Sequence, residues 1–355
     1  MTNRFLTGCI AIETKNARLN GSSRDAEGGG STVQNISYTK KIKSKNGVFP
    51  YGSGAYVKKN IKDFARINGH SISDVKAIDT TQAITEGNPY KNYDEDVMGF
   101  MIASKLSLSE EEFNELSEEE KSTFKKVKKG KKTLYEKNIT KKRKARLMVS
   151  PLQAISSTRI QQEFNTRQTD ATNLIYTREV YSNIMSMGFN LDIDNIGIYT
   201  VSEDESGFRD YSPEEVEVFD LDVDGNGIIE LDKEERNKRI VDSLKAMQYF
   251  NTRIAQTNNL EDLNAKFVIM AEYSIGNNIF NNIFRNSMLD MDYLVEAIEE
   301  NERFRQSKVY IGIRSGFMRS GDKDLKEVLK EMFKGSDNVL VGTVGEAFDE
   351  YIKGL

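Results

Sequence analysis

The segment from Phe49 to Arg66 combines a tight turn with a helix that follows it directly. Pro50, Gly52 and Gly54 are turn residues, and Ser53 is a favoured helix N-cap. Apolar residues recur at helical spacing on one face: Val57, Ile61, Phe64 and Ala65. Cationic residues fall on the opposite face: Lys58, Lys59, Lys62 and Arg66. The pattern predicts a helix that is anchored on one side and positively charged on the other.

Two interpretations of this helix stay open. A helix N-terminus offers backbone N–H groups and the positive end of the macrodipole, and with nearby lysines it suits the phosphates of a polyanion. The alternative is an ordinary amphipathic helix whose lysines are simply solvated.

Composition narrows the protein class. The 355 residues suffice for one large domain or two ordinary ones. The single cysteine, Cys9, excludes an internal disulfide, fits a reducing cytoplasm, and lies among apolar residues as a buried thiol would. The chain has no apolar run of about eighteen residues, and its first residues predict a strand rather than a signal peptide. We therefore expect a cytoplasmic protein with no membrane partner.

Charge is distributed unevenly along the chain. Residues 121–146 carry eleven lysines and two arginines against the single Glu136, a net charge of +12. Because the whole chain has a net charge of −5, the other residues sum to −17. Any nucleic-acid contact must therefore be local. Residues 106–146, acidic in their first half and basic in the second, form either a solvated charged arm or a basic finger that touches nucleic acid.

The order of predicted elements favours an α+β fold. It runs strand, helix, strand, strand, helix, strand, over residues 5–14, 49–66, 147–155, 178–201, 232–250 and 265–271. Within the second of the paired strands, Gly188–Val201 has the alternation of an edge strand. Asp232 and Glu235 form a capping box for the second helix. This order describes a ferredoxin-like sheet, whose face many RNA-binding modules use.

One segment resembles a calcium-binding loop. Its candidate ligands are Asp222, Asp224, Asn226 and Glu230. Lys233 stands where a bidentate carboxylate belongs, so an Asx-rich turn that leads into the next helix is the alternative. Calcium, if bound, would be structural, and no other cofactor is expected.

Sequence motifs of catalysis are missing. The chain has no Walker A string, no nucleophile elbow and no pair of cysteines, and nothing marks two carboxylates as an acid–base pair. His70, the only histidine, has no second histidine or nearby thiol to work with. We therefore expect a protein that is not an enzyme.

Several short strings, in order, resemble one family. They are Leu6–Gly8, Ala17–Asn20, Tyr38–Ile42, Pro50–Gly54, Lys58–Asp63, Asp96–Met101, Ser150–Leu152, Glu179–Tyr181, Gly188–Asp192 and Glu234–Arg239. They are similar to the backbone RNA-binding subunit of the CRISPR surveillance complex Cascade, in the DevR-type, type I-B branch of the Cas-seven family. The resemblance covers about Leu6 to Phe284. Departures are the lysines in place of the family's arginines in the first helix, Ala55-Tyr56 in place of Gln-Ala, the charged insertion and the calcium-like loop.

The resemblance implies a fold with a palm, fingers and a thumb. The palm is a modified RNA-recognition-motif core, and large insertions form the fingers and a thumb hairpin. Residues 1–105 would be the first half of the palm and 106–146 the finger-type insertion. Residues 147–187 would hold a strand and the thumb hairpin, and 188–355 the second half of the palm with C-terminal helices.

The resemblance also implies a non-catalytic subunit that polymerises along CRISPR RNA. Its partners would be CRISPR RNA, target DNA, further copies of itself and other Cascade subunits. Because guide sequences vary, such a protein must hold phosphates and sugars rather than base edges. The candidate RNA-binding residues are Lys40, Lys41, Ser53, Gly54, Lys58, Lys59, Lys62, Arg66, Arg159, Gln161 and Arg167. The last three belong to the polar segment Ser156–Thr177, the candidate thumb, for which a solvated loop is the alternative.

Two other functions are weighed against this one. The first is a metal-dependent ribonuclease, as in type III relatives, with Asp25 or Asp170 as the suspected residue. The second is a calcium-stabilised structural protein.

Overall fold

The computed structural model describes residues 3–22, 36–77, 83–117, 121–122, 124–129, 132–168, 173–204, 206–251, 259–285 and 287–355. The chain forms two compact units, each described here by itself. Unit 1 contains residues 1–69, 147–194 and 237–355, and unit 2 contains residues 70–146 and 195–236. Unit 2 thus takes in more of the chain than the insertion that the sequence suggests at 106–146.

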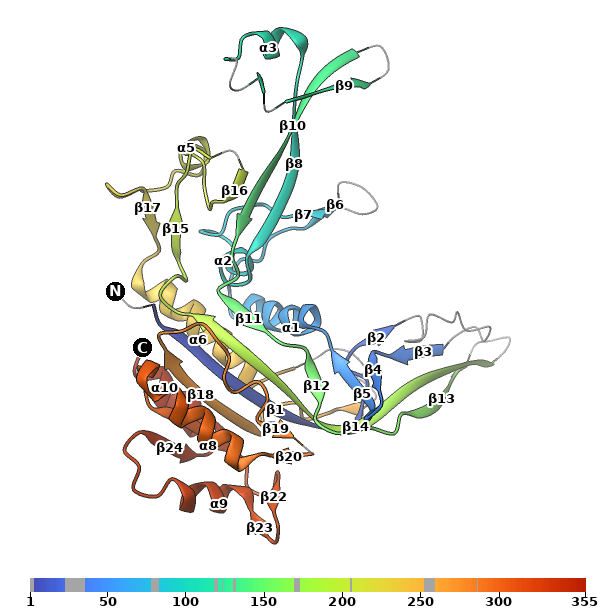
Figure 1. Ribbon diagram of the computed structural model, residues 1–355. Helices are drawn as coiled ribbons and strands as arrows, with labels where there is room; N and C mark the ends of the chain where they lie inside the picture. The colour runs from blue at the N-terminus through green and yellow to red at the C-terminus, as the bar shows by residue number, and fades with distance from the viewer. Residues whose placement is uncertain are drawn as a thin grey trace. The chain divides into compact units, whose positions relative to one another are not determined.

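Unit 1 is built on a large twisted sheet (Figure 1). Its main path runs through β24 (Val339–Gly342), β21 (Val309–Ile313), β18 (Phe267–Tyr273), β1 (Phe5–Ala17), β14 (Asn173–Asp192), β12 (Leu152–Ala154), β5 (Gly47–Gly52) and β4 (Lys41–Ser44). Further strands join β14 or β3: β11 (Leu147–Val149), β13 (Gln161–Gln168), β3 (Ile36–Thr39) and β2 (Gly21–Ser22). The smaller hairpins are β19 (Phe284–Arg285) with β20 (Met288–Leu289), and β22 (Arg319–Ser320) with β23 (Lys323–Asp324).

The centre of this sheet has the predicted ferredoxin-like order. β1 lies between β18 and β14 and is antiparallel to both, and β14 is antiparallel to β11 and β12. Helix α1 (Gly54–Ile67) comes between β1 and β11 in the chain, and α6 (Lys233–Gln248) between β14 and β18. The order strand, helix, two strands, helix, strand therefore closes into an antiparallel sheet, as the sequence predicts.

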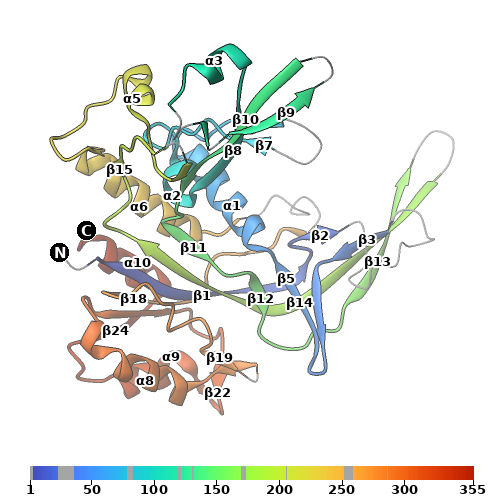
Figure 2. The same cartoon turned by 45° about the horizontal axis from the view of Figure 1, so that its top comes forward.

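The sheet is covered unequally on its two faces. Cys9 and Ala11 of β1 point to one face, where they pack with α8 (Met291–Glu300) and α9 (Leu325–Met332). Leu6 and Ile10 point to the other face because side chains alternate along a strand. Helices α1 and α6 lie on that second side (Figures 1 and 2). Cys9 is fully buried and its thiol is free, and burial raises its pKa.

The C-terminal part completes unit 1. β21 pairs antiparallel with β18, and β24 pairs parallel with β21. A short 3₁₀ helix, η1 (Glu302–Phe304), follows α8. The last helix, α10 (Val344–Ile352), has a capping box between Thr343 and Glu346. Helices α8, α9 and α10 are the C-terminal helices that the sequence analysis expects within residues 188–355.

One element differs from the sequence prediction. Gly188–Val201 is not an edge strand, because residues 188–192 complete β14, which has β1 on one side and β11 on the other. Residues 193–197 then turn, and the chain enters unit 2 at β15 (Ile198–Thr200). The alternation in the sequence reflects two different strands rather than one half-exposed strand.

Unit 2 consists of small sheets and short helices. Its four-stranded sheet contains β16 (Ser206–Phe208), β10 (Lys132–Arg143), β8 (Phe100–Leu108) and β9 (Lys125–Lys129). Two strand pairs accompany it, β15 with β17 (Ile228–Glu230) and β6 (Lys76–Ala77) with β7 (Ala83–Ile84). The helices are α2 (Tyr93–Met98), α3 (Glu110–Asn114) and α5 (Pro213–Phe219). α3 begins directly after Ser109, which forms a capping box with Glu112.

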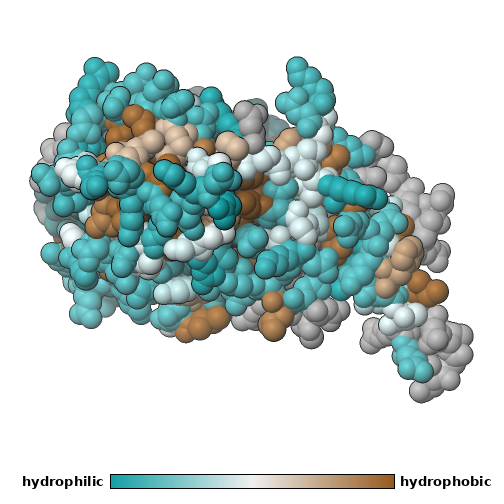
Figure 3. Space-filling view, turned by 90° about the horizontal axis from the view of Figure 1, so that it is seen from below, coloured by the Kyte–Doolittle hydropathy of each residue, from teal (hydrophilic) through white to brown (hydrophobic). Residues whose placement is uncertain are grey.

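The face drawn in Figure 3 is mostly hydrophilic, and its hydrophobic side chains form small separate patches. Among the described helices, none has the length and apolar character needed to cross a bilayer.

Candidate nucleic-acid interface

The start of α1 is held by a small polar cluster around Asn20. Ser53 caps the helix, and its Oγ accepts a hydrogen bond from the backbone N–H of Tyr56 at 3.3 Å. The side-chain amide of Asn20 donates to the same Oγ at 3.1 Å, and its backbone oxygen accepts from Lys40 N–H at 3.1 Å. Asn20 therefore brings together Lys40, Ser53 and Gly54, three of the predicted RNA contacts. The cap takes up the Tyr56 N–H, and the N–H groups of Gly54 and Ala55, which have no partner within the helix, are those left for an anion.

One face of α1 is buried, and the opposite face is cationic, as predicted. Asp63 pairs with both Lys59, at 2.8 Å, and Arg66, at 3.0 Å. Burial lowers the pKa of the Lys58 ammonium, and the charge of neighbouring Lys62 lowers it further. α1 thus holds four cations against one carboxylate, and two of its lysines are close enough to repel each other. An anion bound at this face would relieve that repulsion.

Lys41 makes a different contact from the one predicted. Its ammonium pairs with Glu179 of β14 at 2.6 Å, and the two side chains are only 6% and 7% exposed. Glu179 also accepts a hydrogen bond from the backbone N–H of Thr39 at 2.8 Å. Lys41 therefore fastens the β3–β4 segment to β14, and we leave it out of the proposed interface. The sequence could not reveal this, because Glu179 is 138 positions away.

The candidate thumb is a β-hairpin with a polar hollow at its base. β13 and β14 pair antiparallel from Gln161 opposite Val180 to Gln168 opposite Asn173. The hollow has a volume of about 350 Å³, and its walls include Arg159 and Gln161. Its other lining residues are mostly hydroxyl or amide side chains: Ile155, Ser156, Ser157, Thr158, Ser182, Asn183, Ile184 and Ser287.

Asn183 organises this hollow. Its side-chain amide donates to the Oγ of Ser156 at 2.9 Å and to the Ser156 backbone oxygen at 3.1 Å. The hydroxyl of Thr14 in β1 donates to the Asn183 backbone oxygen at 3.0 Å. The side chains of Arg159 and Gln161 are exposed and make no hydrogen bond or ion pair with another described residue. A hydroxyl-lined floor with an exposed guanidinium at its rim suits a ribose and a phosphate.

Two features of the interface were not predicted from the sequence. Arg18, at the end of β1, has a buried Nε without a partner among the described residues. Burial lowers the pKa of its guanidinium, and the charge of Arg178 lowers it further. Arg178 itself pairs with Glu163 at 2.5 Å. Two guanidinium groups therefore lie close enough to interact at the base of the hairpin, and only that of Arg178 is paired with Glu163.

The second unpredicted feature is a pair of buried polar side chains in the large sheet of unit 1. Thr7 and Asn190 are directly opposite each other on β1 and β14, and both are buried. The hydroxyl of Thr7 and both amide atoms of Asn190 have no hydrogen-bond partner among the described residues. Unpaired buried polar groups cost free energy, so this spot is suited to a bound polar partner or water.

Comparison of this chain with known proteins identifies its family. Residues 51–274 match the family model described as "CRISPR-associated negative auto-regulator DevR/Csa2". The chain belongs to this family. No curated protein matches the sequence. Two solved structures contain similar chains, titled "CRISPR RNA-guided surveillance complex" and "CRISPR RNA-guided surveillance complex, pre-nicking". They have 10% and 9% identity and TM-scores of 0.46 and 0.47, each over 99% of both chains.

In this DevR/Csa2 family member the calcium-like loop acts as a turn. Asp224 accepts hydrogen bonds from the backbone N–H groups of Asn226 and Ile228, both at 2.8 Å, and these bonds lower the pKa of its carboxyl. Glu230 pairs with Arg236. Among the described residues, Asp222 included, no three acidic, histidine or cysteine side chains are grouped so that they could hold a metal ion. We therefore do not propose that this loop binds calcium.

Three predicted or suspected residues fall outside the description. The side chain of Arg167 lies outside the described part of the structure, as do Asp25 and Asp170 entirely.

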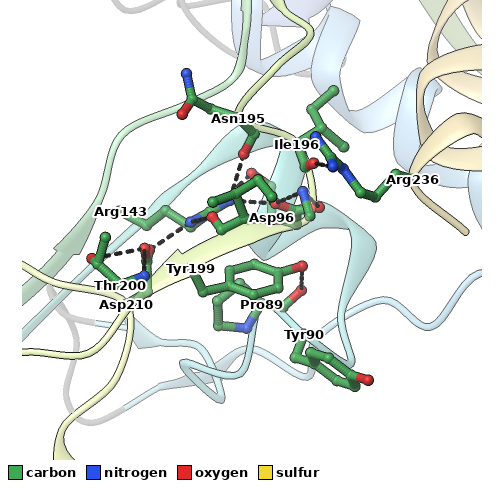
Figure 4. A network of polar contacts seen from close by, with 12 residues as sticks. Pro89, Tyr90, Asp96, Arg143, Asn195, Ile196, Tyr199, Thr200, Asp210 and Arg236 are labelled. Carbon is green, nitrogen blue, oxygen red and sulfur yellow. Dashed lines mark hydrogen bonds and ion pairs between the residues drawn. The ribbon is translucent and has the colours of Figure 1, made fainter. Parts of the chain in front are cut away.

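The lysine-rich run is partly structural in this family member. Lys141 of β10 donates to the Gly87 backbone oxygen at 2.7 Å and pairs with Glu215 at 2.8 Å. Arg143 is buried between Asp96, at 2.5 Å, and Asp210, at 2.6 Å, as Figure 4 shows. These two cations therefore hold unit 2 together and are not available to a partner molecule.

Proposed function

We propose that this chain is a non-catalytic backbone subunit of a type I-B CRISPR Cascade complex, which binds CRISPR RNA in the cytoplasm. Its partners are the CRISPR RNA, target DNA, further copies of this chain and other Cascade subunits. Membership of the DevR/Csa2 family supports a role in a CRISPR system. The family strings in the sequence support the backbone role.

The cationic face of α1 is the observation that carries the proposal. It combines a helix N-terminus, where Ser53 caps only the Tyr56 N–H, with four cations against one carboxylate. Contacts to phosphates do not depend on the nucleotide sequence. A subunit that accepts any guide RNA needs contacts of this kind. The hydroxyl-lined hollow at the base of the hairpin offers a second grip of the same kind.

The hairpin also supports contact with a neighbouring copy or its RNA. Phe164 and Ile175 are 74% and 63% exposed. Phe164 is paired with Thr177 across the hairpin, and Ile175 is paired with Thr166. Paired residues, and residues two positions apart on a strand, lie on the same face, so Phe164 and Ile175 point to the same side. Exposed apolar side chains on a projecting hairpin favour insertion against another surface.

Replacing Arg159 by alanine should weaken RNA binding and flatten its salt dependence. One lost phosphate contact should reduce the slope of log K against log salt by about 0.7 for a single strand. The measurement is fluorescence anisotropy of a labelled oligouridine over a range of salt, on protein freed of its own RNA. Arg303→Ala, on the exposed η1 helix, is the control. An Arg159 variant with an unchanged slope would remove Arg159 from the interface.

The non-catalytic role has its own test. The assembled complex, given complementary RNA and Mg²⁺, should leave that RNA intact. Cleavage that disappears in an Asp25→Ala or Asp170→Ala variant would replace the proposal with a type III-like ribonuclease.

A further inference from the structure

Unit 2 contains a basic hollow that the proposed guide-binding surface does not use. Its volume is about 230 Å³. Its lining residues come from the end of β10 and from the segments around β15 and β16: Lys142, Arg143, Lys144, Arg146, Thr200, Phe208, Arg209 and Asp210. The walls are joined by backbone pairing, since β10 and β16 are parallel with Lys142 beside Phe208, and Arg209 N–H donates to the Lys142 oxygen at 3.1 Å.

The charges of this hollow do not cancel. Arg143 is neutralised by Asp96 and Asp210, and its buried guanidinium also donates to the backbone oxygens of Asn195 and Ile198 (Figure 4). Asp210 is likewise occupied, because it accepts from Thr200 N–H at 3.0 Å. Three other cations of the lining therefore have no carboxylate of their own within it: Lys142, Lys144 and Arg209.

Arg209 is poised to bind an anion. Its Nη1 donates to the Asp204 backbone oxygen at 2.6 Å, which fixes the guanidinium at the wall. Its Nε is buried and has no partner among the described residues. A fixed guanidinium with a donor left over is well suited to a phosphate oxygen.

Phe208 adds an apolar platform at the rim. Its side chain is 76% exposed, and the Lys142 ammonium lies 5.9 Å from its ring centroid. An aromatic ring between cations matches the way single strands are held, with a base stacked on the ring and phosphates on the lysines and arginines. A duplex cannot use such a ring without unstacking, because its base faces are already covered.

We propose that this hollow is a second nucleic-acid site, which binds a single strand by stacking an unpaired base on Phe208 and holding an adjacent phosphate with Arg209 and Lys142. The site goes beyond the proposed function, because it lies in unit 2 and binds a strand that is not paired with the guide. RNA and DNA share both recognised groups, so the strand's sugar is left to the experiment.

The test uses full-length protein with whatever RNA it carries from purification. The probes are labelled oligothymidine, oligouridine and a DNA hairpin duplex, none complementary to the guide. Phe208→Ala should weaken binding of at least one single-stranded probe about 5- to 100-fold, the range for one lost stacking contact. The probe that loses more identifies the sugar, and equal losses indicate that both are taken. Phe208→Trp should keep the binding, because it preserves the stacking surface.

Matched controls separate this site from a general effect. Val218→Ala removes another apolar side chain of unit 2, 77% exposed on α5, and should change nothing. Arg209→Gln should flatten the salt dependence by about 0.7 in slope, whereas Lys233→Gln should not. The proposal is overturned if Phe208→Ala behaves like Val218→Ala, or if it weakens duplex binding as much as single-strand binding. Co-purified RNA should stay at the wild-type level in the Phe208 variants. Its loss would place Phe208 in the guide site instead and so overturn the separate site.

Discussion

Protein in which Lys58 and Lys62 are both replaced by glutamate should be purified without RNA. The two substitutions reverse the charge on one face of α1, where the existing ammonium groups already repel each other. A hydrogen bond to a charged group contributes roughly 1.5–3 kcal/mol. Loss of two such contacts should therefore weaken RNA binding by roughly 10²- to 10⁴-fold. The measurement is the nucleic acid extracted per mole of protein, after expression with a CRISPR array.

A matched variant shows whether position or net charge matters. Lys326→Glu with Lys330→Glu makes the same charge change at the same spacing on α9. This control should keep its RNA, and both double variants should melt near the wild-type temperature. Wild-type amounts of RNA on the α1 variant would contradict the assignment of α1 as the RNA-binding face.

Replacement of Arg143 by alanine should unfold unit 2. The guanidinium is buried, and although burial opposes its charge, Asp96 and Asp210 raise its pKa, so it stays protonated. It also packs against Tyr199, and the guanidinium carbon Cζ of Arg143 lies 4.6 Å from the centroid of the Tyr199 ring. Removing one partner of a buried ion pair costs about 3–5 kcal/mol, and here two carboxylates lose their cation. Limited proteolysis should then cut within residues 70–146 and 195–236 and spare unit 1.

Two companion variants sharpen this test. Arg143→Lys keeps the charge but cannot bridge both carboxylates with a planar fork, so its stability should be intermediate. Lys144→Ala removes an exposed neighbour from the same run and should have little effect. An Arg143→Ala protein that resists protease like the wild type would show that the buried network is not what stabilises unit 2.

Local patterns predict those parts of the fold that local chemistry determines. The helix α1 begins after Ser53 and ends with Asn68 as its C-cap, where the turn residues and the apolar spacing place them. Asp232 accepts a hydrogen bond from Glu235 N–H at 2.9 Å, as an N-cap should. These features depend on residues a few positions apart, so one sequence suffices to find them.

Features that depend on distant pairing escape the sequence. β14 is a central strand because β1 and β11 flank it, and the alternation of residues 188–201 could not show this. Unit 2 joins residues 70–146 to residues 195–236, which no composition change marks.

The candidate site follows the same division between local and distant effects. The cationic face of α1 and the polar base of the hairpin follow from residue types in short segments. Lys41 and Arg143 are equally basic in sequence, but each is turned inward by carboxylates far along the chain, Glu179 for Lys41 and Asp96 and Asp210 for Arg143. The sequence does not single out Arg18 as a candidate site residue, because its interaction with Arg178 arises only when the fold brings the two guanidinium groups close together.

Nuclease protection of co-purified RNA tests the central claim most directly. The protein is purified with its RNA, digested with a nuclease that prefers single strands, and the protected fragments are sized by sequencing. Copies of this chain that grip the sugar-phosphate chain one after another should leave fragments whose lengths differ by one constant period, whatever the guide sequence. Protein without RNA, or protected fragments with no common period, would contradict the account.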